Sequence, residues 1–191
     1  MKTLIALLIF IIPFSTFAQN AYQDYTWGMT VSQVREKAQD LTQDTLIRWG
    51  TPSNVVLYVY GDELVSTIPN PLQYESGEIT YYKSNQNDMD FYFSNGRLIA
   101  IELHFFQENI ISELRRRYGN RPIISATYGR YRYGTAFWGD ANNRRFIVYE
   151  IGTGTPLETV TYINANWLHP LVERAMEEYR RERAGSRSRL D

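Results

Sequence analysis

The chain has 191 residues, with 20 lysine and arginine residues against 21 aspartate and glutamate residues, so its formal net charge is −1 at pH 7. This balance excludes a general nucleic-acid or polyanion binder, which needs a marked excess of positive charge. There is no cysteine, which excludes disulfides, and the chain is long enough to bury a sizeable core without them.

The first 18 residues have the layout of a cleavable secretory signal peptide. Lys2 gives a positive start, residues 4–12 are an unbroken apolar run, and small residues precede a cleavage point after Ala18. The uncharged stretch 3–18 is shorter than the roughly 20 residues that span a bilayer. With no cysteine available for lipidation, we expect a periplasmic or secreted protein that has no direct membrane anchor after signal cleavage.

A first helix-and-meander unit is expected at residues 19–106. The Thr30 side chain can cap backbone amides, and Gln33, three residues later, completes a capping box. Apolar residues then recur near helical spacing as far as residue 41, so a helix is expected to begin at Thr30. Residues 42–77 mix short apolar runs with glycine and proline, which predicts an irregular insertion.

A β-hairpin is the clearest element of this unit. Strands are expected at 78–83, 89–94 and 97–105, and Asn95-Gly96 favours a two-residue type I′ turn because both positions need a positive φ. A tight turn predicts the register of the hairpin, in which Phe93 faces Leu98, Phe91 faces Ala100, Tyr92 faces Ile99 and Asp90 faces Ile101.

A second unit is expected at residues 107–166. Its helix has Asn109 as the expected cap, three arginines at 115–117 in the last turn, and Gly119 as its stop. Four strands are then expected, at 123–127, 135–138, 145–151 and 157–164.

An amphipathic helix is expected at residues 167–183, with Pro170 in its first turn. The tail at 184–191, rich in glycine, serine and arginine, is expected to be disordered.

The two units share one order of elements, and their strands correspond at an offset of about 56 residues. The sequence therefore predicts an α+β fold of two degenerate helix-plus-antiparallel-meander repeats. They are expected to form a sheet with helices on one face, followed by the C-terminal helix. Two unrelated meanders are the alternative.

Short motifs in the first unit form a recognisable series. They are Gly28-Met29-Thr30 with Val34, Gly50-Thr51-Pro52, Tyr81-Tyr82, and Phe91-Tyr92-Phe93-Ser94-Asn95-Gly96-Arg97-Leu98-Ile99. The series resembles the pattern of the small outer-membrane assembly lipoproteins of the SmpA/BamE type. The wider fold group includes the β-lactamase inhibitory protein and uses tandem copies of such a unit.

This resemblance implies the fold and a general function in binding other proteins of the cell envelope. The chain departs from the lipoproteins in three ways: it has no lipidation cysteine, it carries the unit twice, and it has an excursion at residues 61–77. The resemblance therefore implies no specific partner.

Residues with catalytic or metal-binding chemistry are few. The two histidines, His104 and His169, have no ligand partner at helical or hairpin spacing, so no metal site is predicted. Asp88 and Asp90 alternate on one strand and offer a possible acid–base pair, although the edge of a polar loop explains them more simply. We expect no catalytic residue and no cofactor.

Four residues form the most suggestive surface feature: Arg130, Tyr131, Arg132 and Tyr133. Tyrosine and arginine are the residues that most often anchor protein interfaces, which makes this segment the candidate partner-binding site. Tyrosines that simply pack beside a strand crossing are the alternative.

The sequence therefore favours an exported, soluble envelope protein that is not an enzyme and serves as a protein-binding or assembly module. Its expected partner is another envelope protein, and no nucleic acid. The alternatives are a carboxylate-dependent hydrolase and a binder of glycans or small ligands on an aromatic-rich sheet.

Overall fold

The computed structural model describes residues 20–44, 75, 77–86, 88–106, 110–120, 124–128, 131–152 and 157–187. The expected signal peptide and most of the expected insertion at 42–77 lie outside these residues. The described helices are α1 (Val31–Lys37), α3 (Ile111–Tyr118) and α4 (Ala165–Arg187). In the described part of the chain, no helix has both the length and the apolar character needed to cross a membrane.

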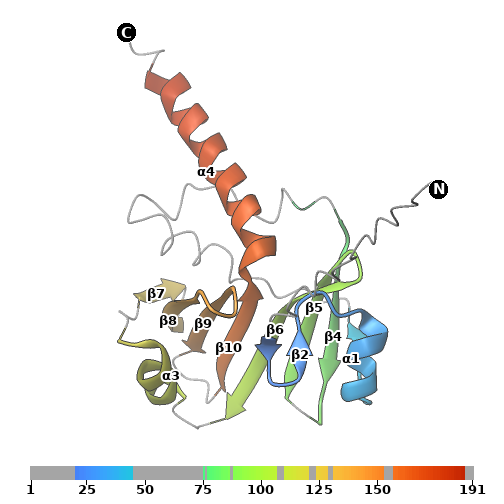
Figure 1. Cartoon of the computed structure of the whole chain (residues 1–191). Coiled ribbons are helices and arrows are strands. Elements are labelled where there is room, and N and C mark those ends of the chain that lie inside the picture. The colour runs from blue at the N-terminus through green and yellow to red at the C-terminus, as the bar shows by residue number, and fades with distance from the viewer. Residues whose placement is uncertain are drawn as a thin grey trace, which may run out of the picture.

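Eight of the described strands form one antiparallel sheet in the order β3-β4-β5-β6-β10-β9-β8-β7 (Figure 1). Within each half a helix is followed by a four-stranded meander, and the last strands of the two halves, β6 and β10, pair at the centre. The expected α+β class is confirmed, and both units belong to one continuous sheet. The strands are β3 (Thr42–Asp44), β4 (Ile79–Ser84), β5 (Met89–Ser94), β6 (Arg97–Phe106), β7 (Ile124–Tyr128), β8 (Tyr131–Asp140), β9 (Arg145–Gly152) and β10 (Leu157–Asn164).

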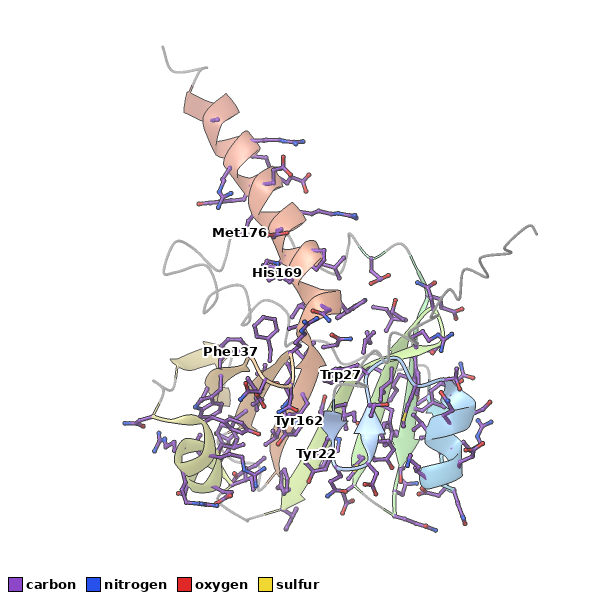
Figure 2. All side chains as sticks on the ribbon, viewed as in Figure 1. Tyr22, Trp27, Phe137, Tyr162, His169 and Met176 are labelled. Atoms are coloured by element: carbon purple, nitrogen blue, oxygen red, sulfur yellow. The ribbon has the colours of Figure 1, made fainter. Side chains whose placement is uncertain are left out.

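One face of the sheet packs against α1, α3 and a small hairpin made of β1 (Asn20–Tyr22) and β2 (Tyr25–Thr26). Tyr22 of this hairpin stacks on Tyr162 of β10, with ring centroids 5.1 Å apart (Figure 2). Trp138 is buried in the same layer and donates its indole hydrogen to the carbonyl of Gly119, which ends α3. Both short helices are thus tied to this face.

The opposite face, which we call the α4 face, packs against the beginning of α4. Leu168 and Val172 are buried against Phe137, Val148 and Ile163 of the second half of the sheet. The helix then continues away from the sheet, as Figure 1 shows. Because side chains alternate along a strand, every central strand contributes to both layers.

The capping box at the start of α1 is confirmed. Thr30 accepts a hydrogen bond from the backbone of Gln33, and the Gln33 side chain accepts one from the backbone of Thr30. The helix is shorter than expected and ends at Lys37. Ala38 and Leu41 are still buried, because the chain beyond the helix keeps both side chains in the core.

The hairpin between β5 and β6 has the expected turn, with φ of 51° at Asn95 and 70° at Gly96. Phe93 faces Leu98 as predicted, but the rest of the predicted register is wrong by one residue. Ile99 forms a β-bulge, an extra residue in β6 with no partner of its own in β5. The observed pairs beyond the bulge are Tyr92 with Ala100, Phe91 with Ile101, Asp90 with Glu102 and Met89 with Leu103.

Helix α4 begins and ends outside the expected range of 167–183. The Asn164 side chain accepts a hydrogen bond from the backbone of Asn166, which starts the helix at Ala165. Pro170 therefore lies inside the helix and not in its first turn. The helix also continues to Arg187, so the first four residues of the expected disordered tail are helical.

Candidate functional site

Five side chains from three neighbouring strands meet on the α4 face: Tyr81 of β4, Asp90 and Tyr92 of β5, and Glu102 and His104 of β6. They line a cavity of about 320 Å³, which we call the polar cavity. The two tyrosines and Asp90 are buried, while the side chains of Glu102 and His104 are 15% and 26% exposed. The cluster thus combines three buried side chains with two that are partly exposed to the cavity.

The bulge at Ile99 creates this arrangement. In the predicted register Asp90 lies opposite Ile101, and its side chain would share a face with apolar neighbours. The extra residue in β6 places Asp90 opposite Glu102 instead. Since residues two apart on a strand share a face, Asp90, Glu102 and His104 all come to the same side of the sheet.

Hydrogen bonds define the geometry of the cluster. His104 Nε2 lies 2.8 Å from Asp90 Oδ2, and the Tyr81 hydroxyl donates to the same oxygen at 2.5 Å. The Tyr92 hydroxyl donates to Glu102 Oε2 at 2.9 Å. Glu102 Oε1 lies 3.8 Å from His104 Nε2, so both carboxylates lie beside the same nitrogen of the imidazole.

These contacts change the acid–base properties of three groups. The pKa of His104 is raised by its hydrogen bond to Asp90, which outweighs burial, and by the charges of Asp90, Glu102 and Asp88. Burial, followed by the neighbouring carboxylates, raises the pKa of Tyr81 and Tyr92. Both tyrosines therefore remain protonated donors, and His104 keeps its proton to a higher pH than an ordinary histidine.

Chemically, the cluster suits a positively charged ligand or a proton-transfer step. Its ligand atoms from Asp90, Glu102 and His104 all lie within 4.8 Å of one another. Ser84, in the wall of the same cavity, donates its hydroxyl hydrogen to Asp40 Oδ1 at 2.6 Å. The proton of that hydroxyl is thus directed to Asp40, whereas an activated nucleophile donates its proton to the catalytic base.

The sequence interpretation of the histidines and aspartates needs correction. His104 does have partners across the hairpin, and the reason they were missed is the bulge, which no sequence motif revealed. Asp90 pairs with Glu102 and not with Asp88, whose carbonyl accepts a hydrogen bond from the His104 backbone. The available signal was the alternation of Glu102 and His104 on β6.

His169 lies apart from the cavity on the exposed side of α4 (Figure 2), 3.5 Å from Glu173.

The candidate partner-binding segment lies at the outer hairpin of the sheet. Tyr131, Arg132 and Tyr133 begin β8 and pair with β7, the last strand in the sheet order. Strand β8 is therefore longer than the expected 135–138. Arg130 lies outside the described residues, and the structure describes only the backbone of the other three. The segment is not brought to the polar cavity, which lies in the other half of the sheet.

A second cavity, of about 540 Å³, lies between the β8–β9 turn and the start of α4, with Phe146 and Pro170 in its wall. Arg145 also lines it, but this guanidinium is bound to Asp140, to the carbonyl of Ala21 and to the Tyr118 hydroxyl. Arg145 therefore holds the fold together, and we place the candidate site in the polar cavity.

Comparisons of the chain with models of protein families, with curated proteins and with solved structures found no match.

Proposed function

We propose that the chain is an exported, non-enzymatic binding protein of the cell envelope, and that its polar cavity binds a positively charged group when the protein engages its partner. The observation that carries this proposal is the cluster of Asp90, Glu102 and His104 at an open cavity. Export rests on the expected signal peptide, and the envelope partner on the resemblance to the assembly lipoproteins.

The balance of charge around the cavity favours a cation. Asp90 and Glu102 carry two negative charges at the cluster, and Asp88 adds a third at the rim. His104 offsets one of these charges while it is protonated and none when its imidazole is neutral. The Lys83 ammonium, which also borders the cavity, lies 2.8 Å from Asp44 Oδ2 and is already paired. The cavity thus keeps a surplus of negative charge, and charges withdrawn from water need an opposite charge nearby.

The walls of the cavity also suit a cation. The Tyr81 and Tyr92 rings lie with centroids 5.1 Å apart, and the Lys83 ammonium is 5.4 Å from the centre of the Tyr81 ring. Aromatic faces attract cations by about 0.5–1 kcal/mol at exposed sites. The Lys83 ammonium already lies over the Tyr81 ring, so this part of the cavity wall accommodates a positive charge.

The hydrogen bonding supports binding over catalysis. Each tyrosine hydroxyl is used to hold one carboxylate, and the Asp90 oxygen that meets His104 also accepts from Tyr81. Such a network holds the acceptor atoms in fixed positions, which favours recognition of one ligand geometry. The outer hairpin with Arg130, Tyr131, Arg132 and Tyr133 remains our predicted contact surface for the partner protein.

The test is capture of partners from the intact envelope after mild crosslinking, using the tagged full chain expressed in its host. Wild type is compared with the Asp90→Asn/Glu102→Gln double variant. Glu173→Gln/Glu177→Gln serves as control, because it removes two charges from exposed positions on α4. We expect one reproducible partner with wild type and control, and at least about tenfold less with the cavity variant. Equal recovery from all three proteins, or no reproducible partner, contradicts the proposal.

A second candidate is a hydrolase, which the 2.8 Å contact between His104 and Asp90 favours as an acid–base pair. Incubation with cell-wall glycan fragments distinguishes the two functions. Turnover that disappears in His104→Gln supports the hydrolase, whereas binding without turnover supports the binding protein.

A further inference from the structure

We infer that Asp90, Glu102 and His104 form a binding site for one divalent transition-metal ion. This inference deepens the proposed function, on which it rests, because it names the positive charge that the polar cavity binds.

The positions of the ligand atoms fit a single ion. His104 Nε2, Asp90 Oδ2 and Glu102 Oε1 belong to three side chains on two adjacent strands, and the ligand atoms of this set lie within 4.8 Å of one another. An ion held at about 2.0–2.2 Å from each ligand separates neighbouring ligand atoms by roughly 3–4 Å. The observed separations from Nε2 are 2.8 Å to Asp90 and 3.8 Å to Glu102, so small side-chain rotations complete the site.

The ligand types select the class of metal. One imidazole nitrogen with two carboxylate oxygens suits zinc, manganese or iron, whereas magnesium and calcium prefer oxygen ligands alone. Three protein ligands also leave at least one coordination position open, and all three residues line the cavity. Sites of this kind keep water or an incoming ligand in the open position, unlike closed structural zinc sites.

The two tyrosines orient the ligands, as outer-shell partners do in metal sites. Tyr92 binds Glu102 through Oε2, which turns Oε1 toward His104. Tyr81 holds Asp90 in place from β4, the strand on the other side of β5. Both tyrosines are buried, so they fix the carboxylates more firmly than exposed residues would.

A separate observation comes from Thr161 of β10. It lies directly opposite Glu102 in the β6–β10 ladder, and its side chain therefore shares the α4 face with the cluster. The residue is 2% exposed, and among the described side chains its hydroxyl is one of the few buried polar groups without a hydrogen-bond partner. The hydroxyl thus keeps a hydrogen bond to give to a water or another polar group on this face, beside Glu102.

The test is titration of the full chain, stripped with a chelator, with Zn²⁺ and Mn²⁺ in a calorimeter, and with Co²⁺ followed by visible absorption. We expect one ion per chain and Co²⁺ bands typical of nitrogen and oxygen ligands. His104→Gln and Glu102→Gln should weaken binding by about 100-fold or more, and Tyr92→Phe by about 10-fold, the range for an outer-shell partner. Absence of binding by the wild-type chain overturns the inference.

His169→Gln is the matched control. His169 also lies beside a glutamate, Glu173, at 3.5 Å, but the group of three potential metal ligands found among the described residues does not include it. Its titration should equal that of wild type. Binding that is lost in His169→Gln and kept in His104→Gln places the ion on α4 and overturns the inference. Far-ultraviolet circular dichroism of each variant shows that lost binding does not reflect lost folding.

The two proposals fail separately. If no metal binds but capture of the partner still depends on Asp90 and Glu102, the metal inference is wrong and the proposed function stands. If the metal binds and capture is the same with and without the cavity carboxylates, the metal site stands and the proposed function is wrong.

Discussion

In the first half of the sheet, the α4 face carries Tyr81, Asp90, Tyr92, Glu102 and His104, whereas in the second half it carries mainly Phe137, Phe146, Val148 and Ile163. The order of elements is the same in both halves. The apolar half receives α4, and the polar half surrounds a cavity. One architecture thus uses equivalent surfaces for two purposes: packing a helix and presenting hydrogen-bonding groups.

The clusters of charged side chains in the two halves differ in the same way. In the second half, Arg145 is bound to Asp140 at 2.9 Å, to Ala21 and Tyr118, and lies 4.9 Å from the centre of the Tyr162 ring. This network joins the sheet to β1 and α3. In the first half, three carboxylates border one histidine at a cavity. We therefore expect the first network to stabilise the fold and the second to serve a ligand.

The largest expected effect is that of Arg145→Met. It leaves the half-buried Asp140 without its cation and removes the links to β1 and α3, so the free energy of unfolding should fall by about 3 kcal/mol or more. Chemical denaturation followed by tryptophan fluorescence measures it. Arg144→Met is the control. The side chain of Arg144, the neighbouring residue, is exposed, so this substitution should change the free energy of unfolding by less than about 0.5 kcal/mol. Equal effects of the two substitutions would refute the structural role of Arg145.

The next effect concerns the helix on the apolar half. Leu168 is fully buried against the sheet, and Leu168→Ala should lower the free energy of unfolding by about 2–5 kcal/mol because it leaves a cavity. Arg180→Ala, at an exposed position of the same helix, should have little effect. Denaturation curves check both, and a Leu168→Ala protein as stable as wild type would show that α4 does not depend on this contact.

A pair of charge-removing substitutions compares the two halves directly. Asp140→Asn should destabilise the protein by about 1–3 kcal/mol, since Asp140 accepts charged hydrogen bonds from Arg145. Glu102→Gln should leave stability unchanged or raise it by up to about 1 kcal/mol, because it relieves repulsion among the carboxylates. Thermal unfolding at pH 7 measures both. A loss of stability in Glu102→Gln as large as that in Asp140→Asn would mean that the polar cavity is a structural network.

The smallest effect is a dependence on pH. Burial raises the pKa of Asp140, but hydrogen bonds from Asn143 and Arg145 outweigh it and leave the pKa below its ordinary value. The carboxylate therefore stabilises the folded state above the ordinary pKa, and this contribution is lost as the pH falls through the lower, folded value. Denaturation curves at several pH values between 5 and 2 should show a steeper loss in wild type than in Asp140→Asn. An equal loss of stability in the two proteins would contradict the lowered pKa of Asp140.

The sequence predicted the fold better than the site, for a reason that can be located. Capping at Thr30 and the turn at Asn95-Gly96 are local, and both were predicted correctly. The bulge at Ile99 depends on how whole strands pack, and no local sequence motif indicated it. Because of this one extra residue, the side chains of β6 beyond the bulge lie on the faces opposite to those predicted, and the pairing of Asp90 with Glu102 was not predicted. The start of α4 was missed because Asn164 was assigned only to a strand and not also recognised as a cap.

The measurement that tests the central claim most directly is native mass spectrometry of the full chain with Zn²⁺, beside His104→Gln and Arg145→Met. Our account predicts one bound ion in wild type, none in His104→Gln at the same concentration, and one in the fraction of Arg145→Met that stays folded. The same number of ions in wild type and His104→Gln, or none in wild type, would contradict the assignment of the polar cavity as a metal-binding site.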